Sequence, residues 1–129
     1  MNSPNKTTFS FEIFPPKPTS EPSVIYGTLD ALQDLKPDFI SVTYGAGGGN
    51  VGANREVCQM IKNAGTTPVT HFTVIKNTKE GIKEQLDQYL ADGVDHMLAL
   101  RGDIPLGETT TCGDFDYATD LVKFLRDTY

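Results

Sequence analysis

The sequence lacks the features that mark secreted and membrane-embedded proteins. It has only two cysteines, Cys58 and Cys112, which are far apart and outside any Cys-x-x-Cys spacing. Such cysteine usage excludes a disulfide scaffold and is typical of a protein in a reducing compartment. No stretch approaches the roughly 18 apolar residues of a membrane span, and the first residues lack the apolar run of a signal peptide. We therefore predict a cytoplasmic protein that does not span a membrane.

Positive charge is also scarce, with 11 lysines and arginines against 17 aspartates and glutamates in 129 residues. Binding a nucleic-acid backbone requires a basic face, so this balance excludes nucleic acid as the main partner. The length corresponds to one domain that can fold without disulfides or a structural metal. His71 and His96 are the only histidines, and no cysteine or carboxylate cluster has the spacing of metal ligands. We predict no metal site.

Four short segments rich in branched and aromatic residues predict strands, at Phe9–Phe14, Phe39–Tyr44, Pro68–Val74 and His96–Leu100. Apolar stripes with helical spacing lie between and after them. Gly65 and Gly93 are placed to end two of these helices, and Asn77 is placed to begin the third. The predicted order is βαβαβαβα, and the short returns from helix to strand favour a parallel sheet.

The repeat length, about thirty residues, decides between two α/β architectures. Eight such units make a TIM barrel of about 250 residues, so four units predict one partial domain over residues 1–129, half of a (β/α)8 barrel. The alternative is a complete doubly wound sheet, whose strands are continuously apolar. These strands instead contain polar side chains, including Ser10, Glu12, Ser41, Thr43 and His71. Polar residues collect at the mouth of a barrel, so we predict the half-barrel.

Glu12 is the first candidate for chemistry, because it lies inside FSFEIFPP between Phe11 and Ile13. An apolar environment disfavours ionisation of a carboxyl group, which is how enzymes keep a general acid protonated near neutrality. The alternative is a glutamate on an edge strand that faces water. The position within a strand favours a general acid.

The glycine-rich segment YGAGGGN, residues 44–50, follows the second predicted strand and, with Gly52, satisfies G-x-G-x-x-G. A dinucleotide site of that type needs an acidic residue about twenty positions later to bind the ribose. No aspartate or glutamate occurs between Glu56 and Glu80. We interpret the glycines as allowing close approach of the backbone to a bound ring system, with a merely flexible loop as the alternative.

Two further candidates lie at the ends of the third and fourth predicted strands. His71 stands within Thr-His-Phe-Thr, although a strand histidine is often only a core residue. Arg101, Gly102 and Asp103 close the fourth strand, where an arginine and an aspartate can hold the polar edge of a cofactor. A surface ion pair is the alternative interpretation of these two charges.

Five strings, in this order, resemble the methylenetetrahydrofolate reductase family: SFEIFPPK, SVTYGAGG, the His-x-Thr of THFTV, LALRGDIP and FDYATDLVKFLR. The resemblance runs from about Phe9 to Tyr129. It implies a flavoprotein TIM barrel in which NADH or NADPH reduces FAD. The reduced flavin then passes hydride to 5,10-methylenetetrahydrofolate, giving the 5-methyltetrahydrofolate used in methionine biosynthesis. The folate is therefore the implied substrate.

The resemblance also implies roles for individual residues. Glu12 matches the general acid that assists opening of the imidazolidine ring of the folate, and Asp103 matches an aspartate beside the pterin and the flavin. The remaining matched positions are implied cofactor contacts: Thr43, Tyr44 and Ala46 along the isoalloxazine, His71 beside it, Arg101 and Gly102 next to the flavin, and the pair Tyr117 and Ala118.

The family's catalytic domains have a second half, with strands five to eight, much of the adenosine and ribityl site and a glutamine that binds folate. None of this corresponds to the 129 residues. One alternative is therefore a non-catalytic half-barrel that binds flavin or folate, or only associates with a partner chain. An aldolase-like barrel is disfavoured, because no predicted strand end carries a lysine. Unpaired strand edges invite pairing, so we expect homo-oligomers or other association through these edges.

Overall fold

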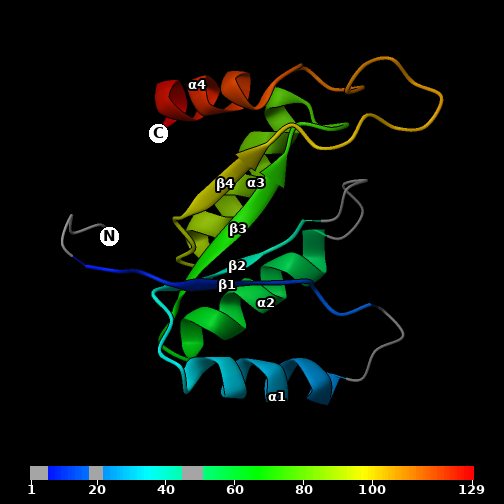
Figure 1. Cartoon of the computed structure of the whole chain (residues 1–129). Coiled ribbons are helices and arrows are strands. Elements are labelled where there is room, and N and C mark those ends of the chain that lie inside the picture. Colours follow the sequence, from blue (N-terminus) through cyan, green and yellow to red (C-terminus); the bar gives the residue numbers. More distant parts are fainter. Residues whose placement is uncertain (1–5, 18–21, 45–50) are drawn as a thin grey trace.

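A computed structural model describes residues 6–17, 22–44 and 51–129, and these form four helices that alternate with four strands (Figure 1). The elements are β1 (Ser10–Ile13), α1 (Pro22–Gln33), β2 (Phe39–Val42), α2 (Val51–Asn63), β3 (Thr67–Thr73), α3 (Lys79–Ala91), β4 (Met97–Leu100) and α4 (Ala118–Thr128). The strands pair in parallel in the order β1-β2-β3-β4. The predicted α/β fold, four consecutive βα units arranged as half of a TIM barrel, is confirmed.

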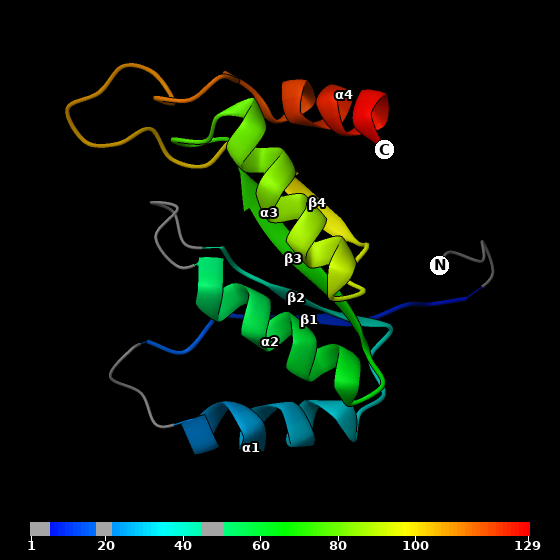
Figure 2. The ribbon, with the colours of Figure 1, turned by 180° about the vertical axis from the view of Figure 1, so that it is seen from behind.

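Helices α2 and α3 cover the same face of the sheet, as the opposite views in Figures 1 and 2 show. Successive side chains of a strand point to opposite faces, so every second residue faces these helices. Ile40 and Val42 of β2 are completely buried there. The helices contribute further buried side chains to this core, among them Ile25, Leu29, Val57, Ile61, Ile82, Leu86 and Leu121. The apolar stripes of the sequence therefore form one continuous core.

The opposite face of the sheet is open. A groove of about 490 Å³ runs across it and is lined by residues that include Ser10, Glu12, Ser41, Val69 and Leu98. Leu98 remains 44% exposed there, although it belongs to a strand. In a complete barrel this face would be the inner surface. Among the residues described, no helix is long and apolar enough to cross a membrane.

The ends of two helices show how well local signals locate boundaries. Gly65 and Gly93 adopt the left-handed conformation, with φ of +94° and +79°, as predicted for helix C-termini. The expected start of α3 at Asn77 is wrong by one residue. Thr78 is the N-cap, and its side-chain oxygen accepts a hydrogen bond from the backbone N–H of Gly81 at 3.1 Å. The side chains of Asn and Thr can both cap a helix. The side-chain amide of Asn77 instead donates to the backbone carbonyl of Thr73.

The long connection from β4 to α4 is anchored to the turn between β3 and α3. The backbone N–H of Lys76 donates to the carbonyl of Thr111 at 2.8 Å, and that of Asp114 donates to the carbonyl of Asn77 at 3.0 Å. Gly113 lies between these two contacts. A Cβ atom at Gly113 would stand 2.6 Å from the Asn77 carbonyl oxygen and 2.8 Å from that of Val74. The anchor therefore depends on a residue without a side chain.

We expect Gly113→Ala to lower the free energy of unfolding by about 1–3 kcal/mol, because the added methyl group collides with backbone atoms that cannot move independently. Urea unfolding monitored by circular dichroism measures the change. Gly27→Ala in α1 is the matched control, since a Cβ there has no neighbour within 4 Å. The control should keep or raise stability, because alanine favours helix. A Gly113→Ala chain as stable as the wild type would contradict the anchor.

Candidate active site

The carboxyl ends of β2, β3 and β4 meet around one pocket of about 320 Å³. Parallel strands end at the same edge of a sheet, so residues far apart in the sequence converge there. The pocket is lined by Thr43, Tyr44, His71, Thr73, Leu100, Arg101, Gly102 and Asp103. Six of these eight are residues that the sequence singled out, and the structure brings them together.

Glu12 lies on the open face beside this pocket and contacts two neighbouring strands. Its carboxylate oxygen Oε1 is 3.1 Å from Nε2 of His71 and accepts a hydrogen bond from Oγ of Ser41 at 3.4 Å. The Glu12 side chain is 56% exposed, whereas that of His71 is only 9% exposed. Glu12, Ser41 and His71 thus form a polar cluster across β1, β2 and β3.

The expectation that apolar neighbours bury Glu12 is wrong for this chain. Phe11 and Ile13 flank it in the sequence, but Ile13 belongs to the core on the helix side of the sheet and Phe11 packs against that core. Because strand side chains alternate between the two faces, Glu12 points away from both of them. Its surroundings are instead the open groove. Desolvation of this carboxylate requires something that covers the open face.

Two buried polar atoms of β3 have no hydrogen-bond partner among the described residues: Nε2 of His71 and Oγ1 of Thr73. The contact between His71 and Glu12 is close, but it lacks the geometry of a hydrogen bond. Leaving a buried polar group unpaired costs about 1–3 kcal/mol. Both residues line the pocket. A bound group with polar edges can supply the missing partners.

Gly102 shapes the opposite wall of the pocket. Its φ is +85°, and a Cβ atom there would stand 2.6 Å from Cγ1 of Ile75 and 3.1 Å from Cβ of Thr73. Only glycine fits this conformation and this space. The neighbouring Arg101 and Asp103 are exposed, and no ion pair joins them among the described side chains. Nε of Arg101 instead donates to the Gly102 carbonyl at 3.1 Å, so the surface ion pair is excluded as an interpretation.

Tyr44 contributes to the pocket differently from the other residues. Its side chain is 2% exposed, and its ring packs against Phe72 with the ring centres 5.1 Å apart. Its hydroxyl donates a hydrogen bond to Oε1 of Gln85 on α3 at 2.7 Å. Burial raises the pKa of the Tyr44 phenol above its ordinary value. The phenol group therefore belongs to the core.

The structure does not bring the last implied contacts into the pocket. Tyr117 is 63% exposed and caps α4, where its backbone N–H donates to the Asp120 carboxylate at 3.0 Å. Ala118 is the first residue of the same helix. Ala46 lies outside the described residues. Sequence reasoning missed Thr73 and Leu100, which line the pocket. The alternation of β3 from His71 identifies Thr73 as a residue of the same face.

Asn54 of α2 holds the end of β2 from behind the sheet. It is completely buried, and its Nδ2 donates to the carbonyls of Val42 at 3.1 Å and Thr43 at 2.9 Å. Its Oδ1 accepts from the hydroxyls of Thr70 at 2.8 Å and Tyr89 at 2.6 Å. This one side chain therefore joins α2 to β2, β3 and α3 directly beneath the pocket.

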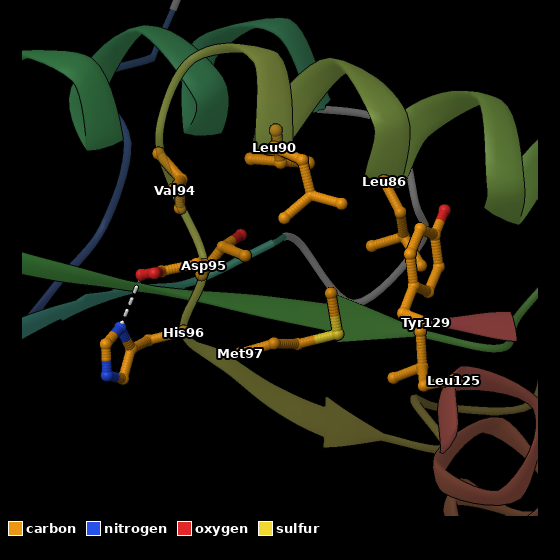
Figure 3. A pocket seen from close by; sticks show the side chains of 10 residues that line it. Leu86, Leu90, Val94, Asp95, His96, Met97, Leu125 and Tyr129 are labelled. Atoms are coloured by element: carbon orange, nitrogen blue, oxygen red, sulfur yellow. Dashed lines mark hydrogen bonds and ion pairs between the residues drawn. The ribbon is translucent and has the colours of Figure 1, made fainter. Parts of the chain in front are cut away.

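A second pocket of about 180 Å³ lies on the helix side, between α3, β4 and α4 (Figure 3). Its lining is mostly apolar, with Leu86, Leu90, Val94, Met97 and Leu125. None of the site residues inferred from the sequence lines it. Two of its polar members, Asp95 and His96, already pair with each other at 2.8 Å. The strand-end pocket is therefore the candidate site.

Comparison with known proteins gives a consistent family. A family model described as methylenetetrahydrofolate reductase matches residues 1–129. The 5,10-methylenetetrahydrofolate reductase of Pectobacterium carotovorum subsp. carotovorum is 37% identical over 120 residues, covering 92% of this chain and 39% of that protein. The protein of the same name from Escherichia coli (strain K12) is 36% identical with the same coverage.

Methylenetetrahydrofolate reductase (NADH) 1 of Arabidopsis thaliana is 33% identical over 128 residues, covering 96% of this chain and 22% of that protein. The chain thus spans less than half the length of these relatives. Since the family model matches all 129 residues of the chain, the chain belongs to the methylenetetrahydrofolate reductase family.

Proposed function

We propose that this chain supplies the first four βα units of a flavin-dependent enzyme that reduces 5,10-methylenetetrahydrofolate to 5-methyltetrahydrofolate with NADH or NADPH. One observation carries the proposal. Six residues that the family pattern singles out, from three different strand ends, line a single pocket. Active sites of TIM barrels form at this end of the strands. The name of the Arabidopsis relative contains NADH, and the proposal for this chain includes either NADH or NADPH as the electron donor.

The residues of the pocket fit FAD. The unpartnered Nε2 of His71 and Oγ1 of Thr73 offer hydrogen bonds to the polar edge of a flat ring. Gly102 leaves its side of the pocket free of a side chain. When bound, FAD supplies the hydride chemistry that links a nicotinamide to the folate. The protein's part is then to hold the ring between β3 and the β4 end and to place the folate beside Glu12.

Glu12 is the proton donor in this proposal. As the C–N bond of the imidazolidine ring breaks, the departing nitrogen takes the proton of the Glu12 carboxylic acid, which becomes a carboxylate. Ser41 donates a hydrogen bond to the carboxyl group from the neighbouring strand, and the His71 ring lies 3.1 Å from it. The remaining half of a barrel would cover the open face and remove water from Glu12, which favours its protonated form.

The direct test uses a complete barrel, made by joining residues 1–129 to the part of the Pectobacterium relative that the match does not cover. This protein should bind FAD and reduce methylenetetrahydrofolate with NADH or NADPH. A folded, monomeric barrel that binds neither flavin nor folate would overturn the proposal. A barrel that binds both without turnover would favour a non-catalytic half-barrel instead.

Asp103→Asn should raise the midpoint potential of the bound flavin in the complete barrel by about 30 mV. A negative charge beside the flavin disfavours the anionic reduced form, and about 1.4 kcal/mol of charge interaction corresponds to 30 mV in a two-electron couple. Redox titration measures the shift. Asp116→Asn is the control, because it removes the same charge from an exposed residue outside the pocket. Unchanged potential and folate turnover would place Asp103 away from the chemistry.

We also propose that the chain on its own associates through its open face and outer strands. β1 and β4 are the outer strands of the sheet, and Leu98 is exposed on the groove. Burying even ~500 Å² of apolar surface is worth about 12 kcal/mol, comparable with the stability of a whole domain. Sedimentation velocity should therefore show dimers or larger assemblies.

A substitution locates the associating surface. Leu98→Lys places a charge on the open face and should shift the distribution toward monomer. Leu106→Lys, at a fully exposed residue of the β4–α4 connection, should leave it unchanged. A wild-type chain that sediments as a monomer would refute association through the open face.

A further inference from the structure

Of the three strand ends that border the pocket, those of β2 and β3 lack direct pairing at the level of Thr43 and Thr73. The ladder between β2 and β3 ends with Val42 opposite Thr70. Beyond it, the backbone N–H of Thr43 donates to the Ile13 carbonyl of β1 at 3.0 Å and not toward β3. Thr43 and Thr73 nevertheless line the same pocket. Behind the sheet, Asn54 links the carbonyls of Val42 and Thr43 to the hydroxyl of Thr70, but none of its hydrogen bonds reaches Thr73.

A chain of three side-chain hydrogen bonds connects these ends behind the sheet. The hydroxyl of Tyr44 donates to Oε1 of Gln85 at 2.7 Å. Nε2 of Gln85 donates to Oδ1 of Asn77 at 3.2 Å. Nδ2 of Asn77 then donates to the backbone carbonyl of Thr73 at 2.8 Å. The connection runs from the end of β2, through α3, to the end of β3.

The direction of every bond in this chain is fixed by its last member. A backbone carbonyl only accepts, so the amide nitrogen of Asn77 must face Thr73. The oxygen of Asn77 then faces Gln85, the nitrogen of Gln85 faces Asn77, and the oxygen of Gln85 is left for Tyr44. Each amide uses both of its ends. The three bonds therefore form one unit, and the loss of any member removes at least one hydrogen bond from its neighbour in the unit.

The same hydrogen-bonded unit also contacts the β4–α4 connection, whose first residues line the pocket. The backbone carbonyl of Asn77 accepts from the N–H of Asp114, and its backbone N–H donates to the Val74 carbonyl at 3.2 Å. Asp114 belongs to the β4–α4 connection, which begins with Arg101, Gly102 and Asp103. Asn77 is thus the point at which the β3 end, α3 and this connection meet.

We propose that Gln85 and Asn77 are positioning residues of the strand-end pocket, which set its width by tying Tyr44 to the Thr73 carbonyl. Neither residue lines the pocket. They act through the backbone at Thr43 and Thr73, where the ligand would lie between β2 and β3. Only the identity of the ligand, FAD, rests on the proposed function.

The test compares four variants of the chain of residues 1–129. Gln85→Met keeps the length of the side chain and removes both the oxygen and the nitrogen of its amide group. Tyr44→Phe removes one end of the chain of bonds, and the double variant combines the two. Tyr129→Phe is the matched control, since its hydroxyl also donates to a residue of α3, Asp87, at 2.7 Å but lies at the C-terminus.

Hydrogen exchange of the unliganded chain, followed by mass spectrometry, tests the positioning without any cofactor. Gln85→Met should speed exchange about tenfold in peptides from both the β2 end and the β3 end, and leave α1 unchanged. The control should alter only α4 and its contact on α3. Unchanged exchange at either strand end would overturn the inference.

Titration with FAD, followed by flavin fluorescence, tests the effect on the pocket. Both single variants should weaken binding about tenfold, and the double variant should also lose about tenfold, because the bonds act as one unit. The visible spectrum of bound flavin at saturation should shift in these variants and not in the control.

If the losses of affinity in the two single variants multiply in the double variant, or if the variants bind FAD like the wild type, the positioning role is refuted. If the wild type binds no FAD while the exchange result holds, the flavin assignment fails and the positioning of the strand ends stands.

Discussion

Glu12→Gln in the complete barrel should lower the rate of folate reduction by about 10²–10⁴ while reduction of the flavin by the nicotinamide keeps its wild-type rate. The amide has nearly the shape of the carboxyl group and can still accept a hydrogen bond from Ser41. It has no acidic proton to deliver to the ring nitrogen of the folate. The loss therefore falls on one half-reaction.

Stopped-flow measurement of the two half-reactions separates the alternatives. Glu56→Gln is the control, because it changes the same group on an exposed position of α2. An equal loss in both half-reactions would indicate a structural role for Glu12. Full activity of Glu12→Gln would show that another group, or water, donates the proton.

Asn54→Leu should lower the free energy of unfolding by about 3–5 kcal/mol. Leucine has a similar volume but can neither donate to the carbonyls of Val42 and Thr43 nor accept from the hydroxyls of Thr70 and Tyr89. Each buried group left without a partner costs about 1–3 kcal/mol. Because whole domains are stable by only about 5–15 kcal/mol, this single change removes a large part of the stability.

Urea unfolding and the yield of folded protein measure this effect. Asn63→Leu is the control, since it makes the same replacement at an exposed position of the same helix. It should change stability by less than about 0.5 kcal/mol. An Asn54→Leu chain within 1 kcal/mol of the wild type would mean that water satisfies these groups and that the buried contacts contribute little.

The repeating βα architecture could be predicted from the sequence, because buried apolar residues recur with the period of a helix or of a strand. The predicted strands at Phe39–Tyr44 and Pro68–Val74 match β2 and β3 within two residues. Branched residues at alternate positions and glycines at helix ends are local signals, and local signals locate elements. The parallel order follows from the short returns between them.

The surroundings of individual site residues depend on tertiary structure and were harder to predict. Neighbours in the sequence suggested a buried Glu12, but in a strand the immediate neighbours point to the other face. The same alternation assigns Tyr44 to the core, together with Ile40 and Val42. The positions of Tyr117 and Ala118 depend on the course of the β4–α4 connection, which no periodic pattern encodes. Motif strings thus identified the residues but not their orientation.

The alternation of the strands also has an evolutionary consequence. In β2 and β3 the even-numbered residues, such as Ile40, Val42, Thr70 and Phe72, pack beneath the helices, whereas odd-numbered ones, such as Ser41, Val69 and His71, face the groove or the polar cluster. Within β2 and β3, the positions that face the groove and the positions that form the core are therefore separate sets. A mutant library restricted to the odd positions would explore new ligands while the hydrophobic core keeps its packing. The same separation would let selection change the site at little cost to folding.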